Sequence, residues 1–133
     1  MNERQVNGTV LVIDDEGELR QLVQLKLERK GGYRVLTAHN GQTGVALAQA
    51  HHPDVIVVDY LMPQMDGLEV IRRLKGDART SHIPVIMLSS IGDEETMASS
   101  LQLGAAAHVT KDSLMAGLPH EVELAVARHR DLH

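Results

Sequence analysis

Acidic, hydroxyl and basic side chains follow four short apolar runs of the sequence. The runs read VLVI, VIVV, VIML and AAHVT, and the chemically capable residues after or at their ends are Asp14, Asp15, Asp59, Ser89 and Lys111. The first three runs are unbroken, which is typical of parallel strands that are covered on both faces. Because ligands bind at the carboxyl ends of such strands, we expect these five side chains to converge at one edge of a sheet.

Three clustered carboxylates need positive charge nearby. Two like charges about 4 Å apart repel by roughly 4 kcal/mol at an effective dielectric constant near 20. Lys111 supplies one positive charge, which is too little for three acids. A hard divalent ion held by few carboxylates and several waters is the pattern of magnesium, so we predict Mg²⁺ as the cofactor. HExxH, EF-hand and cysteine motifs, which would favour zinc or calcium, do not occur in the sequence.

An acid beside magnesium and lysine is suited to phosphoryl chemistry. The metal and the ammonium group neutralise charge on phosphoryl oxygens, and a positioned carboxylate can attack phosphorus. Asp59 is the best candidate for the nucleophile because its strand, VIVV, is the most apolar and central one.

The elements that position these residues alternate along the chain. We predict strands over 10–13, 33–38, 55–58, 85–88 and 106–110, and helices over about 17–30, 41–52, 67–75, 93–103 and 119–130. Asp66 can cap the third helix and Gly76 can end it. The alternation predicts one α/β domain with an open parallel sheet and helices on both faces.

Each of these residues also has an ordinary structural interpretation. An aspartate after a strand often forms a turn or caps a helix, so Asp15 or Glu16 could simply start the first helix. Ser89 could be a loop hydroxyl, and a single lysine is more often a solvated surface charge. The equivalent position of all of them at strand ends favours the functional interpretation.

Composition narrows the classes of function. The net charge is 13 − 18 = −5. Phenylalanine and tryptophan are absent, and there are two tyrosines, Tyr33 and Tyr60. We therefore exclude nucleic acid as a direct partner, since binding it needs basic patches or stacking rings. No apolar run is long enough to span a membrane, the N-terminus lacks a signal peptide, and there is no cysteine. We predict a cytoplasmic protein without membrane contact.

The same residues resemble a known family. Asp14-Asp15, Asp59 with Met62-Pro63 and Met65-Asp66-Gly67 after it, then Ser89 and Lys111, are similar to the receiver domain of two-component response regulators. The intervals also match, with 44 residues from Asp15 to Asp59, 30 more to Ser89 and 22 more to Lys111. The resemblance covers residues 8–130 and leaves 1–7 and 131–133 as terminal extensions.

The resemblance implies a flavodoxin-like (βα)5 fold with strand order 2-1-3-4-5. It implies a phosphorelay switch in which Asp59 takes a phosphoryl group from a histidine kinase or histidine phosphotransfer protein. Asp15 would ligate Mg²⁺ directly, Asp14 directly or through water, and Asp59 and the Leu61 carbonyl would complete the set. Ser89 would bind the phosphoryl group and Lys111 would pair with it.

The resemblance also implies that phosphorylation changes the face built by the fourth helix, the fifth strand and the fifth helix. The protein would not be an enzyme beyond taking part in its own phosphorylation and autodephosphorylation. Its target would be a downstream protein or a fused output domain, and a homodimer stays open. The chain is either a stand-alone regulator or part of a longer protein.

Two positions depart from the family pattern. His108 stands where the family usually has Tyr or Phe as a switch residue, and Asp112 stands where proline often follows the lysine. His108 is either a pH-sensitive switch or an ordinary half-buried, neutral strand histidine, and we favour the second. We also hypothesise that the apolar residues Leu61 and Ile91 hinder attacking water and lengthen the acyl-phosphate lifetime.

Three rival functions remain. A pseudo-receiver that only binds protein would not need the intact acids, hydroxyl and lysine. An aspartyl-nucleophile phosphatase normally has a second aspartate two residues after the first, where this chain has Leu61. A flavin-binding flavodoxin would need a phosphate-binding glycine loop after the first strand, and more aromatic rings than this chain has.

Overall fold

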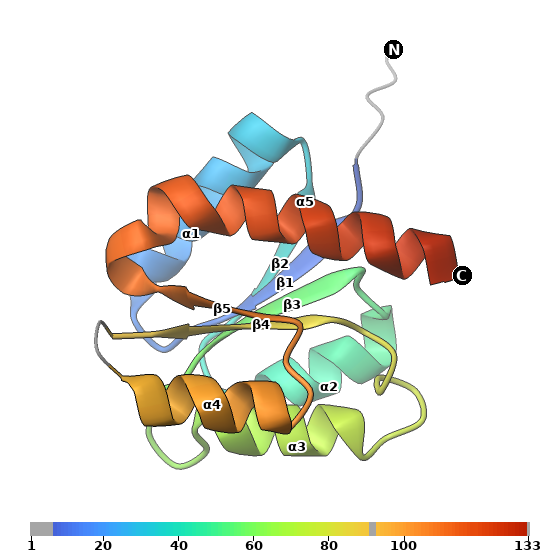
Figure 1. The fold of residues 1–133 in the computed structure, drawn as a ribbon. Coiled ribbons are helices and arrows are strands. Elements are labelled where there is room, and N and C mark those ends of the chain that lie inside the picture. The colour runs from blue at the N-terminus through green and yellow to red at the C-terminus, as the bar shows by residue number, and fades with distance from the viewer. Residues whose placement is uncertain (1–6, 91–92, 133) are drawn as a thin grey trace.

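A five-stranded parallel sheet forms the centre of the protein (Figure 1). The computed structural model describes residues 7–90 and 93–132. The strand order is β2-β1-β3-β4-β5, which confirms the predicted flavodoxin-like topology. The strands are β1 (Thr9–Ile13), β2 (Arg34–Ala38), β3 (Val55–Asp59), β4 (Val85–Ser89) and β5 (Ala107–Thr110).

Helices cover both faces of the sheet. Helices α1 and α5 lie on one face, and α2, α3 and α4 lie on the other (Figure 1). Their bounds are α1 (Gly17–Gly31), α2 (Gly41–His51), α3 (Gly67–Lys75), α4 (Glu94–Gln102) and α5 (Leu114–Leu132), with a 3₁₀ turn, η1 (Lys111–Ser113), before α5. This arrangement confirms the predicted layers.

Alternation along the strands divides the core into two halves. Val10 and Val12 of β1 pack into the half under α1 and α5, whereas Leu11 and Ile13 pack into the half on the opposite face. All four side chains are fully buried. Since each buried side chain of this size stabilises the fold by about 1.5–3 kcal/mol, the strands form a rigid base for the residues at their ends.

The predicted helix boundaries are wrong at one place. We expected the last helix to begin near Pro119, but α5 begins at Leu114 and contains Pro119 in its interior. Proline is most common in the first turn of a helix, so it served as a start signal in the sequence. In the structure the helix continues through Pro119, which has no backbone N–H to donate, and η1 leads directly into α5.

The predicted cap of the third helix is confirmed. The Asp66 side chain accepts a hydrogen bond of 2.9 Å from the Glu69 backbone N–H, and Gly76 occupies the C-cap position. Within the described residues, no helix combines the length and the apolar character that a bilayer crossing requires. The domain limits of 8–130 stay a prediction, and residues 1–6 and 133 of the proposed extensions lie outside the described residues.

Candidate functional site

Strand register brings the predicted site residues to one edge of the sheet. Ile13 of β1 pairs with Val58 of β3, so the residues that follow, Asp14 and Asp59, lie side by side. On the other side of β3, Asp59 pairs with Leu88, and Ser89 comes one step later. Segments 14–15, 59, 89 and 111 are far apart in the chain and meet here because the strands are parallel and in register.

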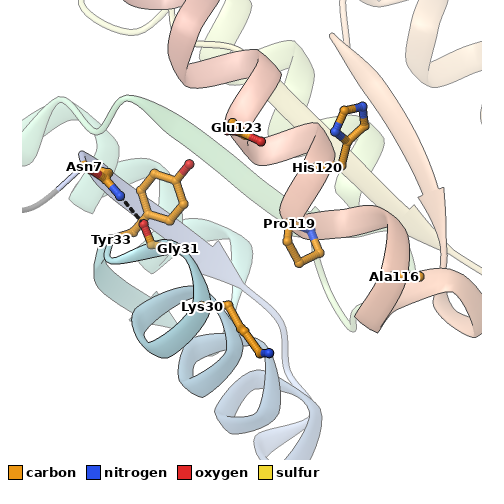
Figure 2. A pocket seen from close by; sticks show the side chains of 8 residues that line it. All are labelled: Asn7, Lys30, Gly31, Tyr33, Ala116, Pro119, His120 and Glu123. Carbon is orange, nitrogen blue, oxygen red and sulfur yellow. Dashed lines mark hydrogen bonds between the residues drawn. The ribbon is translucent and has the colours of Figure 1, made fainter.

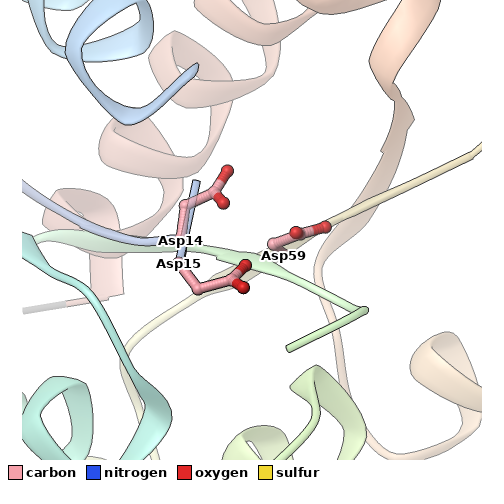
Figure 3. Close-up of side chains that lie close together, drawn as sticks. All are labelled: Asp14, Asp15 and Asp59. Carbon is pink, nitrogen blue, oxygen red and sulfur yellow. The ribbon is translucent and has the colours of Figure 1, made fainter. Parts of the chain in front are cut away.

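Asp14, Asp15 and Asp59 form a carboxylate cluster. One oxygen from each residue lies within 4.8 Å of the other two (Figure 3). Asp14 is fully buried and Asp59 is 2% exposed, whereas Asp15 is exposed. Glu16 occupies the N-cap position of α1, but its side chain makes no capping hydrogen bond. The Asp15 carboxylate thus lies in the cluster, and the Glu16 side chain does not cap the helix.

Lys111 supplies a positive charge to the cluster. Its Nζ donates to Asp59 Oδ2 across 3.1 Å, and the pair links the end of β3 to the turn after β5. Two buried carboxylate oxygens, Asp14 Oδ2 and Asp59 Oδ1, have no hydrogen-bond partner among the described residues. Buried polar atoms are nearly always partnered, so these two oxygens are suited to holding a cation.

Burial changes the proton affinity of the site. Burial, with a smaller effect from the Asp59 charge, raises the pKa of Asp14 to about 6, although the Glu16 backbone N–H opposes the change. Burial also raises the pKa of Asp59, against the opposing hydrogen bond and charge of Lys111. Burial alone would lower the pKa of Lys111, but its contact with Asp59 outweighs this and the net change is upward. Burial thus disfavours the charged form of both aspartates, and the Lys111 charge favours it.

Ser89 and His108 are joined by a hydrogen bond. Ser89 Oγ lies 2.5 Å from His108 Nε2, between the end of β4 and the middle of β5. His108 is a half-buried strand residue, and burial lowers its pKa although the Asp93 charge opposes the change. This agrees with the neutral strand histidine that the sequence favoured. The bond itself was missed, because sequence reasoning placed the two residues by element and not by side-chain direction.

The turn after β3 holds Leu61 at the rim of the site. Leu61 is 72% exposed, and the Gly67 N–H donates to the Tyr60 carbonyl across 2.8 Å to close the turn into α3. A Cβ on Gly67 would lie 2.7 Å from the Asp59 carbonyl oxygen, so only glycine fits there without a backbone shift. Ile91, the second residue of the water-exclusion hypothesis, lies outside the described residues.

Arg20 helps to position the end of β1, and the sequence alone did not predict this role. Its Nη1 donates to the backbone carbonyl of Asp14 across 2.7 Å and so fastens α1 to the end of β1. Arg20 lies six residues after Asp14, on the first turns of a predicted helix. That spacing was visible in the sequence, but an arginine on a helix surface gives no signal of a backbone partner.

A groove of about 410 Å³ lies between α1 and α5 (Figure 2). Lys30 and Glu123 bring charges of both signs to it, and His120 and Tyr33 form part of its wall. Tyr33 directly precedes β2, at the amino ends of the strands, so the groove lies away from the carboxylate cluster. None of the chemically capable residues predicted from the sequence lines it.

Comparison with known proteins decides the family. The response regulator receiver domain family matches residues 10–123. The chain belongs to this family. The receiver is 39% identical to the phosphate regulon transcriptional regulatory protein PhoB of Pseudomonas aeruginosa, over 80% of the receiver and 46% of PhoB. It is 38% identical to the DNA-binding dual master transcriptional regulator RpaA of Synechocystis, over 92% of the receiver and 48% of RpaA.

Solved receivers share the fold. A response regulator receiver domain protein from Clostridium thermocellum is 29% identical and superposes with a TM-score of 0.86, over 94% of this chain and 98% of that one. The receiver therefore spans about half the length of PhoB and RpaA, but nearly the whole of the solved domain. It is a receiver domain of the two-component response regulators, which are signalling switches and not classical enzymes.

The exclusion of nucleic acid as a partner is wrong. PhoB and RpaA are named as transcriptional regulators, and RpaA as DNA-binding. The prediction rested on a net charge of −5 and few aromatic rings, which describe only the surface of this chain. A receiver can belong to a nucleic-acid-binding system without basic patches of its own, because these relatives are about twice as long as the segment they share with it.

Proposed function

We propose that this receiver is a phosphoacceptor switch of a phosphorelay, with Asp59 as the phosphorylated residue. The observation that carries the proposal is the buried Asp59 carboxylate, with Lys111 Nζ on one oxygen and no described partner on the other. A carboxylate held in this way presents a free oxygen to an incoming phosphorus atom. A histidine kinase or histidine phosphotransfer protein as the donor, and a cytoplasmic location, are part of the same proposal and rest on family membership.

Asp14, Asp15 and Asp59, with the backbone carbonyl of Leu61, would hold Mg²⁺. The residues fit a hard cation because the cluster has three carboxylates within 4.8 Å and two unsatisfied buried oxygens. When bound, the metal supplies positive charge to the phosphoryl oxygens and favours the ionised form of the acids.

Phosphoryl transfer would proceed by direct displacement. The free Asp59 oxygen attacks phosphorus, the bond from phosphorus to the donor nitrogen breaks, and the imidazole leaves with the electron pair and takes up a proton. Asp59 must be ionised, which Lys111 favours through its hydrogen bond and its charge. Lys111 can then pair with the phosphoryl group, and the Ser89 hydroxyl can donate to it.

Hydrolysis of the acyl phosphate would return the receiver to its resting state. Leu61, exposed beside the site, would slow this step by limiting the approach of water. The phosphorylated state would be read on the face formed by α4, β5 and α5, since Ser89 and His108 connect the site to β5. A pseudo-receiver that binds partners without phosphorylation is the alternative, and the departure at His108 is the feature that favours it.

Intact-mass measurement tests the proposal. The protein is incubated with Mg²⁺ and a small-molecule phosphodonor, alongside Asp59→Asn and the matched control Asp112→Asn, which changes an exposed acid next to Lys111. We expect one alkali-labile phosphoryl adduct on the wild type and the control, and none on Asp59→Asn or without the metal. A folded, metal-binding wild type that acquires no adduct would support the pseudo-receiver instead.

A further inference from the structure

The Ser89 hydroxyl already has a partner in this structure. Ser89 Oγ and His108 Nε2 are 2.5 Å apart, and Ser89 is 2% exposed. The other acceptor within reach, the Ser90 backbone carbonyl, is at 3.4 Å. The short contact with the imidazole is thus the main interaction of this hydroxyl, and it points along the sheet toward β5, where Ser89 pairs with Thr110 and Met87 pairs with His108.

A serine hydroxyl has one proton to donate. Burial lowers the pKa of His108, so the neutral imidazole is favoured, and in the tautomer that carries its proton on Nδ1 the Nε2 atom accepts the Ser89 proton. While the proton lies on the bond to His108, it is not available to a phosphoryl oxygen on Asp59. The two acceptors therefore compete for one donor.

We propose that His108 is a positioning residue that holds the Ser89 hydroxyl away from the phosphoryl site and must release it when Asp59 is phosphorylated. The inference rests on the proposed function, because it needs a phosphoryl group at Asp59. His108 does not touch that group and acts only through Ser89. Its release from Ser89 is what would free the β5 side chain to change the α4-β5-α5 face, in place of an aromatic ring.

The competition predicts whether a substitution at His108 raises or lowers the affinity for a phosphoryl analogue. His108→Phe keeps a ring of similar size and removes the acceptor, so the Ser89 hydroxyl is free before the ligand arrives. We expect about 2- to 10-fold tighter binding of a phosphoryl analogue, which is the range for one net hydrogen bond. His108→Gln keeps an acceptor near the position of Nε2 and should return the affinity toward the wild-type value.

Beryllofluoride with Mg²⁺ is the probe, and its dissociation constant is measured for four proteins in a double-mutant cycle. The proteins are the wild type, His108→Phe, Ser89→Ala and the double variant. Ser89→Ala should bind more weakly because a donor is lost. His108→Phe should tighten binding in the presence of Ser89 and change it less than about 2-fold in its absence, since the effect is transmitted through that hydroxyl.

A second measurement needs no substitution. The nitrogen resonance of His108 Nε2 in the wild type should shift when beryllofluoride is added, because the ring loses its donor. A merely structural histidine would keep its resonance. An unchanged resonance, or equal affinities of the wild type and His108→Phe, would overturn this inference and leave the proposed function standing. Failure of the folded wild type to bind beryllofluoride would overturn both.

Discussion

Asp14 is an acid that the fold buries without giving it a full set of partners. Its Oδ1 accepts a hydrogen bond from the Glu16 N–H, and its Oδ2 has no partner among the described residues. An ionised carboxylate in this position is costly because burial removes its water. Asp14 is therefore better suited to binding a cation than to stabilising the metal-free fold.

Replacing Asp14 should stabilise the metal-free protein in a pH-dependent way. Its pKa is about 6 in the folded state against 3.8 as the reference value, so the folded state binds the proton more tightly. This stabilising contribution is present below about pH 4 and is lost as the pH rises through 6. We expect Asp14→Asn to gain about 1–3 kcal/mol in the free energy of unfolding above pH 6, and little at pH 4.

Chemical denaturation in the presence of a chelator, at several pH values, measures the free energy of unfolding of Asp14→Asn and of the wild type. Asp112→Asn is the control for the loss of one exposed negative charge. A gain for Asp14→Asn that is equal at pH 4 and pH 7 would contradict the assignment to burial.

Leu61 should control the lifetime of the phosphorylated state. Because it is 72% exposed beside the site, a polar side chain there can be introduced without disturbing the core. We expect Leu61→Asn to speed dephosphorylation several-fold by orienting water toward phosphorus, as measured by loss of the phosphoryl adduct with time. Leu61→Met keeps the apolar character and should have the wild-type rate. An unchanged rate in Leu61→Asn would sink the water-exclusion hypothesis.

At the scale of elements, the turn between β3 and α3 determines where Asp59 and the Leu61 carbonyl lie. The turn is fastened by the Asp66 cap and by the hydrogen bond from the Gly67 N–H to the Tyr60 carbonyl. Gly67 packs against the backbone of Asp59 and Tyr60 and against the Met87 sulfur. The start of α3 is thus in direct contact with the residue proposed to receive the phosphoryl group.

Adding one methyl group at Gly67 should disturb both stability and the site. In Gly67→Ala the new Cβ would meet backbone atoms at 2.7 and 2.9 Å, which cannot rotate away. We expect a loss of about 1–3 kcal/mol in the free energy of unfolding and slower phosphorylation of Asp59. Gly17→Ala is the matched control, since its nearest neighbour would be an arginine side chain at 3.8 Å. Equal stability of the two variants in thermal unfolding would contradict the packing argument.

At the scale of the molecule, the parallel sheet brings residues that are far apart in the sequence close together. The two halves of the core, one under α1 and α5 and one under α2, α3 and α4, keep the strands in a fixed register. Burying the acidic residues at the strand ends destabilises the fold, but the apolar core stabilises the domain enough to offset this. A ligand that neutralises them should therefore stabilise the entire domain.

Magnesium should raise the stability of the wild type. At a free concentration ten times the dissociation constant, binding to the folded state alone adds about 1.4 kcal/mol to the free energy of unfolding. We expect this gain at pH 7 in thermal or chemical unfolding, and a much smaller one in Asp14→Asn and Asp59→Asn. Sodium chloride at matched ionic strength is the control for screening. An equal gain in the wild type and both variants would rule out the cluster as the binding site.

The residues of the candidate site could be predicted from the sequence because strand ends are visible in it. The apolar runs before Asp14, Asp59 and Ser89 predict buried parallel strands, and the topology of such sheets brings their carboxyl ends together. The first polar residue after each apolar run therefore identifies a side chain that lies at this edge of the sheet. The start of α5 was harder to predict, since Pro119 is compatible with both the first turn and the interior of a long helix.

Only the tertiary structure decided how the side chains are oriented. The sequence determined the acids, the lysine, the fold and the family pattern, because these depend on residue type and periodicity. The bond between Ser89 and His108, the Arg20 contact with the Asp14 carbonyl and the close approach of Gly67 to Asp59 depend on rotamers and on strand register. The bond between Ser89 and His108 joins residues 19 positions apart, and even the shorter-range contacts of Arg20 and Gly67 depend on how packing orients side chains and turns, which no local pattern encodes.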